Sequence, residues 1–183
     1  MTGWAAVFRL PVSYSLLITV LEVNPMVDLY DELQDTVLRF DKKYDRLDET
    51  LTLIKLAPDK WTLREIMGHL IDSASNNHQR FVRLQMESVL DFPGYGDKNE
   101  QWIQIQQYNK MSFHALLKLW VSYNLFLCHV IQYIDPGMLH HVWKAKKSTN
   151  TLGEISLDYL RHLKEHLIHF EDRLKEVRGK RYG

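Results

Sequence analysis

The stretch WTLREIMGHLIDSASNNHQRFVRL, from Trp61 to Leu84, has the pattern of a long amphipathic helix. Its apolar side chains recur at steps of three and four residues, which places them on one face of a helix. They are Leu63, Ile66, Leu70, Ala74, Phe81 and Leu84. The run Thr62-Leu-Arg-Glu65 is a capping box, in which Thr62 accepts from the Glu65 amide and Glu65 reaches back. We therefore predict a helix that begins after Thr62.

Three further segments have the same periodicity and are predicted to be long helices. They are 28–54, 112–134 and 152–177. The first carries an apolar stripe of Leu29, Leu33, Val37, Phe40, Tyr44, Leu47, Leu51 and Ile54. The second is expected to direct inward Leu116, Leu119, Trp120, Tyr123, Leu127, Val130 and Ile134. The last follows a second capping box, Thr151-Leu-Gly-Glu154.

The connections complete the predicted architecture. A turn-rich break at 91–96 precedes a short helix at 99–109, and residues 138–150 read as a polar loop. With no strand predicted after residue 25, we expect an all-α fold, a four-helix bundle with a short extra helix in the long connection. Because the connection between the second and third long helices is long, the sequence does not decide whether consecutive helices alternate in direction.

The chain divides into three predicted parts. Residues 1–25 form an N-terminal extension, either an arm packed on the domain or upstream sequence, and the sequence does not separate the two. Its apolar run, Tyr14–Leu21, is too short to span a bilayer. Residues 26–179 form the helical-bundle domain, and residues 180–183 form a tail.

Composition excludes several classes of protein. The 183 residues suit one domain, and 23 Lys and Arg balance 23 Asp and Glu. A net charge of zero argues against a dedicated nucleic-acid or membrane surface. A single cysteine excludes a disulfide framework and favours a reducing compartment, so we expect a cytoplasmic protein. Nine histidines are about twice the usual share.

Three of these histidines lie at the flanks of predicted buried faces. His162 and His166 are four residues apart, hence one turn apart on one helix, and His69 flanks the apolar face of another. Three imidazoles around one ion leave a position open for water or substrate, and without clustered Cys they favour Zn, Ni, Fe or Cu. A solvated surface pair has the same spacing, so this alternative stays open.

The remaining histidines and the cysteine are given structural roles. His169 lies further round its helix and is expected to be more exposed than its neighbours. Helix surfaces or flanks are predicted for His78, His114 and His129, and a loop for His140 and His141. Cys128 lies among apolar residues, which predicts an inert buried thiol.

Three stretches resemble the DinB/YfiT-like superfamily of metal-dependent helical-bundle enzymes. Trp61–Asp72 is similar to its signature W-(S/T)-x-x-(E/Q)-x-x-x-H-L-x-D. Leu90–Trp102 resembles its central loop, and Tyr159–His169 resembles its C-terminal H-x-x-x-H-x-x-H helix. The resemblance covers residues 26–179.

This resemblance implies a divalent metal, Zn or Ni, held by His69, His162 and His166. Asp72 and His169 match further motif positions and are candidates for supporting the ligands. The implied activity is that of a hydrolase or a thiol S-transferase acting on a small molecule, with a low-molecular-weight thiol as a further partner, in a homodimer by analogy. The alternative is a non-catalytic metal-binding or structural bundle that serves as a dimeric interaction module.

No catalytic side chain is predicted beyond these ligands. Four residues of the central loop are placed where they could line the cleft, without a catalytic role: Tyr95, Asp97, Glu100 and Trp102.

Overall fold

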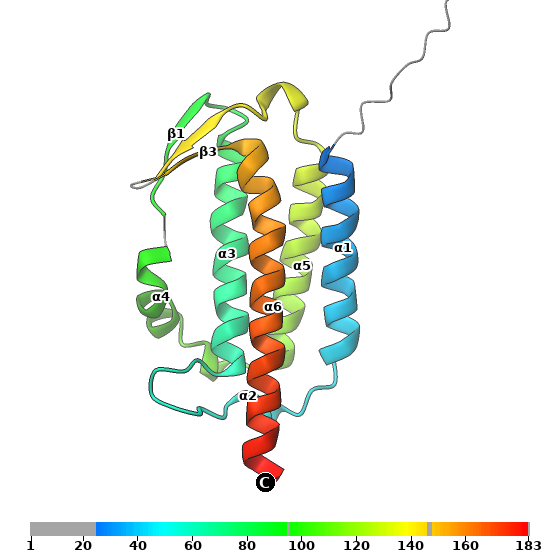
Figure 1. Ribbon diagram of the computed structural model, residues 1–183, viewed down its shortest axis with the longest axis vertical. Coiled ribbons are helices and arrows are strands. Elements are labelled where there is room, and N and C mark those ends of the chain that lie inside the picture. Colours follow the sequence, from blue (N-terminus) through cyan, green and yellow to red (C-terminus); the bar gives the residue numbers. More distant parts are fainter. Residues whose placement is uncertain (1–24, 95, 146–147, 183) are drawn as a thin grey trace, which may run out of the picture.

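A computed structural model describes residues 25–94, 96–145 and 148–182 (Figure 1). Four long helices surround one hydrophobic core: α1 (Pro25–Tyr44), α3 (Leu63–Arg83), α5 (Phe113–Gln132) and α6 (Leu152–Tyr182). The predicted all-α four-helix bundle is therefore confirmed. Residues 1–24 lie outside the described part, so both interpretations of the N-terminal extension stay predictions.

The four helices do not alternate in direction along the chain. In Figure 1, α1 and α6 run downwards while α3 and α5 run upwards. Because α3 and α5 are consecutive long helices with the same direction, the chain has to return along the bundle between them. The connection contains β1 (Val89–Asp91), a 3-10 turn (Gly96–Lys98), α4 (Asn99–Gln106) and a second 3-10 turn (Tyr108–Lys110). The predicted extra helix of this long connection is therefore present as α4.

Hydrogen bonds between residues three positions apart cap the N-termini of α3 and α6, at the positions that the sequence predicted. The Glu65 amide donates to Thr62 Oγ1 over 3.1 Å, and the Thr62 amide donates to a Glu65 carboxylate oxygen over 2.8 Å. The Thr151 amide donates in the same way to the Glu154 carboxylate over 2.7 Å. Both capping boxes are confirmed, and the first holds the α3 segment that carries His69.

Helix α5 packs against both α1 and α3. An aromatic cluster ties it to its neighbours: Phe40 of α1 lies 5.4 Å from Trp120 of α5 and 5.2 Å from Phe170 of α6, measured between ring centroids. Among the described residues, α5 is also the one helix with the length and hydropathy of a membrane span, a property that the core helix of a soluble protein shares.

The first predicted helix is interrupted. Helix α1 ends at Tyr44, and a short helix, α2 (Glu49–Thr52), follows after a turn. The reason is Asp48, whose carboxylate accepts from the Thr50 amide over 2.9 Å and starts a new helix. Leu47 and Ile54 still pack against the core, so their periodicity reflected burial rather than one continuous helix.

The prediction of no strand after residue 25 was wrong. Three short strands form one sheet: β1, β2 (Val142–Lys144) and β3 (Thr149–Thr151). β2 pairs with β1 in parallel and with β3 antiparallel, with Val89 opposite Val142 and Trp143 opposite Asn150. Three-residue strands are too short to show an alternating pattern, which is why 138–150 read as a loop.

Two smaller expectations were also wrong. Leu119 is 46% exposed, because the buried stripe of α5 runs through Leu116, Leu117 and Trp120 and leaves position 119 outside it. Helix α6 continues to Tyr182 instead of ending near Val177, so residues 180–182 are helical.

Candidate metal centre

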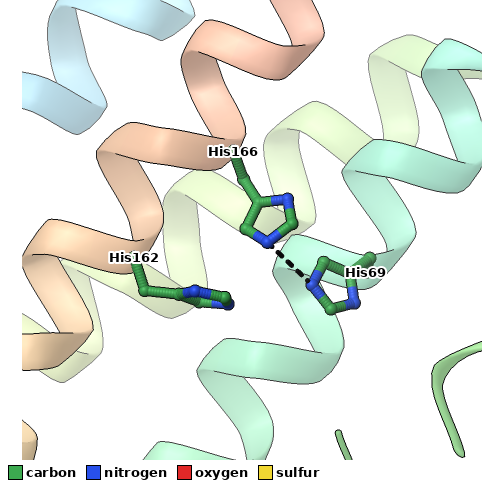
Figure 2. Close-up of side chains that lie close together, drawn as sticks. All are labelled: His69, His162 and His166. Atoms are coloured by element: carbon green, nitrogen blue, oxygen red, sulfur yellow. Dashed lines mark hydrogen bonds between the residues drawn. The ribbon is translucent and has the colours of Figure 1, made fainter.

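Three histidines from two helices converge between α3 and α6 (Figure 2). His69 projects from α3, and His162 and His166 project from adjacent turns of α6. One ring nitrogen of each lies within 4.8 Å of one ring nitrogen of the other two. The Nε2 atoms of His69 and His166 are 3.2 Å apart. The fold therefore brings together the three residues that the sequence singled out, although their role as ligands stays a prediction.

The indole of Trp61 covers one side of this cluster. Its ring centroid lies 5.1 Å from that of His69. Trp61 is held from two directions: its Nε1 donates to Glu100 over 2.8 Å, and its carbonyl accepts from the buried Arg173 of α6. The start of α3, the long connection and α6 are thus joined beside His69.

Burial keeps the imidazoles uncharged. Desolvation, reinforced by the neighbouring histidines, lowers the pKa of His69 to about 3 and that of His166 to about 4. Desolvation also lowers the pKa of His162. His69 is only 2% exposed, more buried than its predicted flank position suggested. Because neutral imidazole is the form that binds metal, the cluster presents its donors in the required state near neutral pH.

His169 stands outside the cluster. It is half-buried, as are His162 and His166, and its ring centroid lies 6.2 Å from that of His166. Its Nε2 is 3.4 Å from the guanidinium of Arg173, and burial followed by that positive charge lowers the pKa of His169. A fixed cation beside this nitrogen disfavours a second cation there.

The hydrogen bonds of Asp72 run to the long connection. Its Oδ1 accepts from the Tyr108 hydroxyl over 2.6 Å and from the Gln106 amide over 2.5 Å. The Tyr108 ring packs against Gly68, where a Cβ atom would come within 2.0 Å of it. Burial raises the pKa of Asp72. In this structure Asp72 anchors the end of α4 and the 3-10 turn after it onto α3, next to His69.

The donor set fits a divalent transition metal. Two nitrogens bound to one tetrahedral ion at about 2.0–2.1 Å are about 3.3 Å apart, and the Nε2 atoms of His69 and His166 are 3.2 Å apart. Without an ion this contact is an N–H···N hydrogen bond. The Nδ1 of His166 is buried without a hydrogen-bond partner among the described residues. Three imidazoles without a thiolate suit Zn or Ni rather than Mg or Ca.

Comparisons with known proteins place this fold. No family model matches the chain. A protein of Oceanobacillus iheyensis named "Putative metal-dependent hydrolase" is 25% identical over 149 residues, which cover 80% of each chain. The structure of YfiT from Bacillus subtilis, described as a probable metal-dependent hydrolase with an unusual four-helix bundle topology, matches with a TM-score of 0.68. The match covers 83% of this chain and 87% of YfiT at 13% identity. The chain has the YfiT-like fold. The resemblance that the sequence suggested is thereby confirmed at the level of the fold.

A cavity of about 340 Å³ opens beside the histidine cluster of this YfiT-like bundle. His162 forms part of its wall, together with Ser73, Asn77 and Arg80 of α3 and with Trp143 of β2. None of these four other residues was predicted as a site residue. A signal was present, because Ser73, Asn77 and Arg80 follow His69 at steps of four, four and three residues and so lie on one face of the helix.

One central-loop residue contacts the surroundings of the cluster, whereas the other histidines do not join it. Glu100 bonds to Trp61, as described, and Tyr95 is outside the described residues. The surface positions predicted for His114 and His129 are confirmed, and His78 is half-buried. His140 is exposed, whereas His141 packs inward with its Nδ1 2.5 Å from the Leu84 carbonyl oxygen.

Proposed function

We propose that the chain is a metal-dependent hydrolase of a small molecule, with a divalent ion held by His69, His162 and His166. The observation that carries the proposal is the convergence of three imidazole nitrogens within 4.8 Å beside a cavity. The names of the Oceanobacillus relative and of YfiT support the same general activity.

The residues around the cluster support a catalytic rather than a structural metal. Among the described residues, no fourth His, Cys, Asp or Glu joins the group, and a structural zinc usually has four protein ligands. An ion held by three ligands supplies Lewis-acid chemistry, polarising a carbonyl or phosphoryl group and acidifying water. Trp61 shields His69 on one side, and the cavity beside His162 is the place for substrate.

We further propose that the ion is zinc or nickel and that water is the attacking molecule. Imidazole donors suit both metals. A protein nucleophile is not needed, and Cys128 is unsuited to that role because burial raises its pKa to about 12. A thiol S-transferase would use the same cluster with a low-molecular-weight thiol in place of water. The experiment therefore measures both hydrolysis and thiol transfer.

The test starts from protein purified without a polyhistidine tag. Elemental analysis is expected to find about one equivalent of zinc or nickel, and a panel of esters and amides is expected to include a substrate that is hydrolysed without added thiol. His166→Ala should lose most of the metal and the activity while keeping its far-UV circular dichroism. The exposed His114 provides the control, and His114→Ala should behave as wild type.

Three outcomes would contradict the proposal. Metal content equal to wild type in His166→Ala would exclude the ligand assignment. Turnover that requires an added thiol would replace hydrolysis by thiol transfer. Bound metal without turnover of any compound in either panel would favour the non-catalytic binding module.

A further inference from the structure

The cavity beside the cluster extends along one face of α3 away from His69. Arg80 lies on the same face as His69, and their separation of eleven positions corresponds to about 16 Å of helix. The cavity is lined both by His162 of the cluster and by Arg80, so one small molecule in it can reach both. Its volume, about 340 Å³, is within the range of small-molecule sites.

Arg80 is a buried cation held in a fixed orientation. It is only 6% exposed. Its Nη1 donates to Asn77 Oδ1 over 3.1 Å, and its guanidinium carbon lies 3.9 Å from the centre of the Trp143 ring. A guanidinium stacked on an aromatic face presents its N–H donors along its edges, in the geometry that binds a carboxylate with two parallel hydrogen bonds.

The small sheet accounts for the position of Trp143. Trp143 is the middle residue of β2 and pairs with Leu90 of β1 and Asn150 of β3. Its Nε1 donates to the Phe92 carbonyl over 2.8 Å, which fixes the indole above Arg80. The three strands that the sequence did not predict therefore hold the aromatic face on which the guanidinium rests.

The charges of the cavity favour a single negative charge on its ligand. Two carboxylates also line it, but Glu154 accepts from the Thr151 amide and Asp158 accepts from Arg161 Nε over 3.0 Å. These acids would repel a dianion more than a monoanion. One guanidinium together with two engaged carboxylates thus suits a carboxylate better than a phosphate dianion.

We propose that this cavity binds a small organic carboxylate, with the carboxylate on Arg80 and the bond to be hydrolysed beside His162. This inference names the substrate class of the proposed hydrolase and rests on that function. The substrate is then an ester or amide that carries a free carboxylate at its far end. Asn77 and Trp143 are positioning residues, because they act through Arg80.

The test uses benzoate and benzamide, which have nearly the same shape and differ in charge. Binding to metal-free protein is measured by NMR titration. Because no metal is present, the observed binding cannot come from coordination of the carboxylate by a metal. Benzoate is expected to bind at least about ten-fold more tightly than benzamide. Arg80→Gln should weaken benzoate binding by a similar factor, and Arg80→Lys, which keeps the charge without the planar fork, should weaken it less.

Arg83→Gln is the matched control, because Arg83 is an exposed arginine on the same helix and should leave benzoate binding unchanged. If Arg80→Gln does not fold, nuclear Overhauser contacts between benzoate and the Trp143 indole of the wild-type protein are the expected result. Equal binding of benzamide, retained benzoate binding in folded Arg80→Gln, or absence of those indole contacts would overturn the proposal.

Tighter binding of inorganic phosphate than of benzoate would overturn the choice of a carboxylate.

Two further results separate this inference from the proposed function. Failure of the carboxylate site would leave metal content and ester hydrolysis intact. Failure of the metal site would leave benzoate binding to the metal-free protein intact.

Discussion

The Nε2 atoms of His69 and His166 lie 3.2 Å apart although the two residues are 97 positions apart in the chain. In the metal-free protein this distance requires one ring to donate a hydrogen and the other to accept it. A bound ion would require a lone pair on both Nε2 atoms, so the ring that donates here would have to carry its hydrogen on Nδ1 instead. The contact therefore links the stability of the α3–α6 pair to metal and to pH, and the first two predictions follow from this link.

Removing the metal should lower the thermal stability of the protein. A ligand that binds only the folded state stabilises it by about 2.7 kcal/mol at one hundred times its dissociation constant, which corresponds to several degrees in Tm. A chelator should lower Tm in differential scanning calorimetry, and added zinc or nickel should restore it. His162→Ala should show no such response, whereas His114→Ala should respond like wild type. An equal Tm of the wild-type protein with and without saturating metal would contradict the prediction.

Acid should destabilise the metal-free protein at a higher pH than carboxylate titration alone would cause. Burial lowers the pKa of His69 to about 3 and that of His166 to about 4, whereas an unfolded histidine has a pKa of about 6.5. Below about pH 6.5 the unfolded state binds more protons than the folded state. The free energy of unfolding should then fall with falling pH by up to about 1.4 kcal/mol per pH unit for each imidazole.

Urea unfolding between about pH 7 and pH 5 measures this slope before most carboxylates titrate. His166→Gln should flatten the slope. The matched control is His129→Gln, because His129 is an exposed histidine on a different helix. An equal slope in wild type and His166→Gln would show that these imidazoles are not held neutral by the fold.

Adding one methyl group at Gly68 should destabilise the bundle. A Cβ atom there would lie 2.0 Å from Tyr108 Cδ2, and the ring cannot withdraw without losing its hydrogen bond to Asp72. Gly68→Ala is expected to lower the free energy of unfolding by about 1–3 kcal/mol in chemical denaturation. Gly179→Ala, at an exposed helical position with nothing within 4 Å, should be neutral or gain up to about 1 kcal/mol. Similar effects at the two sites would refute the close packing of Tyr108.

Cys128 should be inert in the folded protein. It is buried in α5, and burial raises its pKa to about 12, so almost no thiolate exists near pH 8. A chromogenic disulfide reagent should label no thiol in the native state and one thiol per chain in concentrated guanidinium chloride. Fast labelling of native protein would indicate that α5 opens or that the thiol is accessible.

The sequence predicted best where local geometry decides the structure. The capping boxes at Thr62 and Thr151 need only residues three positions apart, and both form as predicted. The sequence did not predict the break after α1. Leu47 and Ile54 keep the helical spacing of apolar residues on both sides of Asp48, whose side chain begins the next helix. The exposure of Leu119 was missed, because the spacing of apolar residues does not say which neighbours a helix will have.

The sequence by itself determined the four long helices, and it placed His162 and His166 one turn apart on one of them, because a helix repeats every 3.6 residues. Only the tertiary structure decided that His69 faces this pair, since α3 and α6 are packed together by the whole core. It also decided that Trp143 of a three-residue strand lies on Arg80 of a helix. Such contacts depend on burial shared among distant segments, and no short stretch of the chain encodes them.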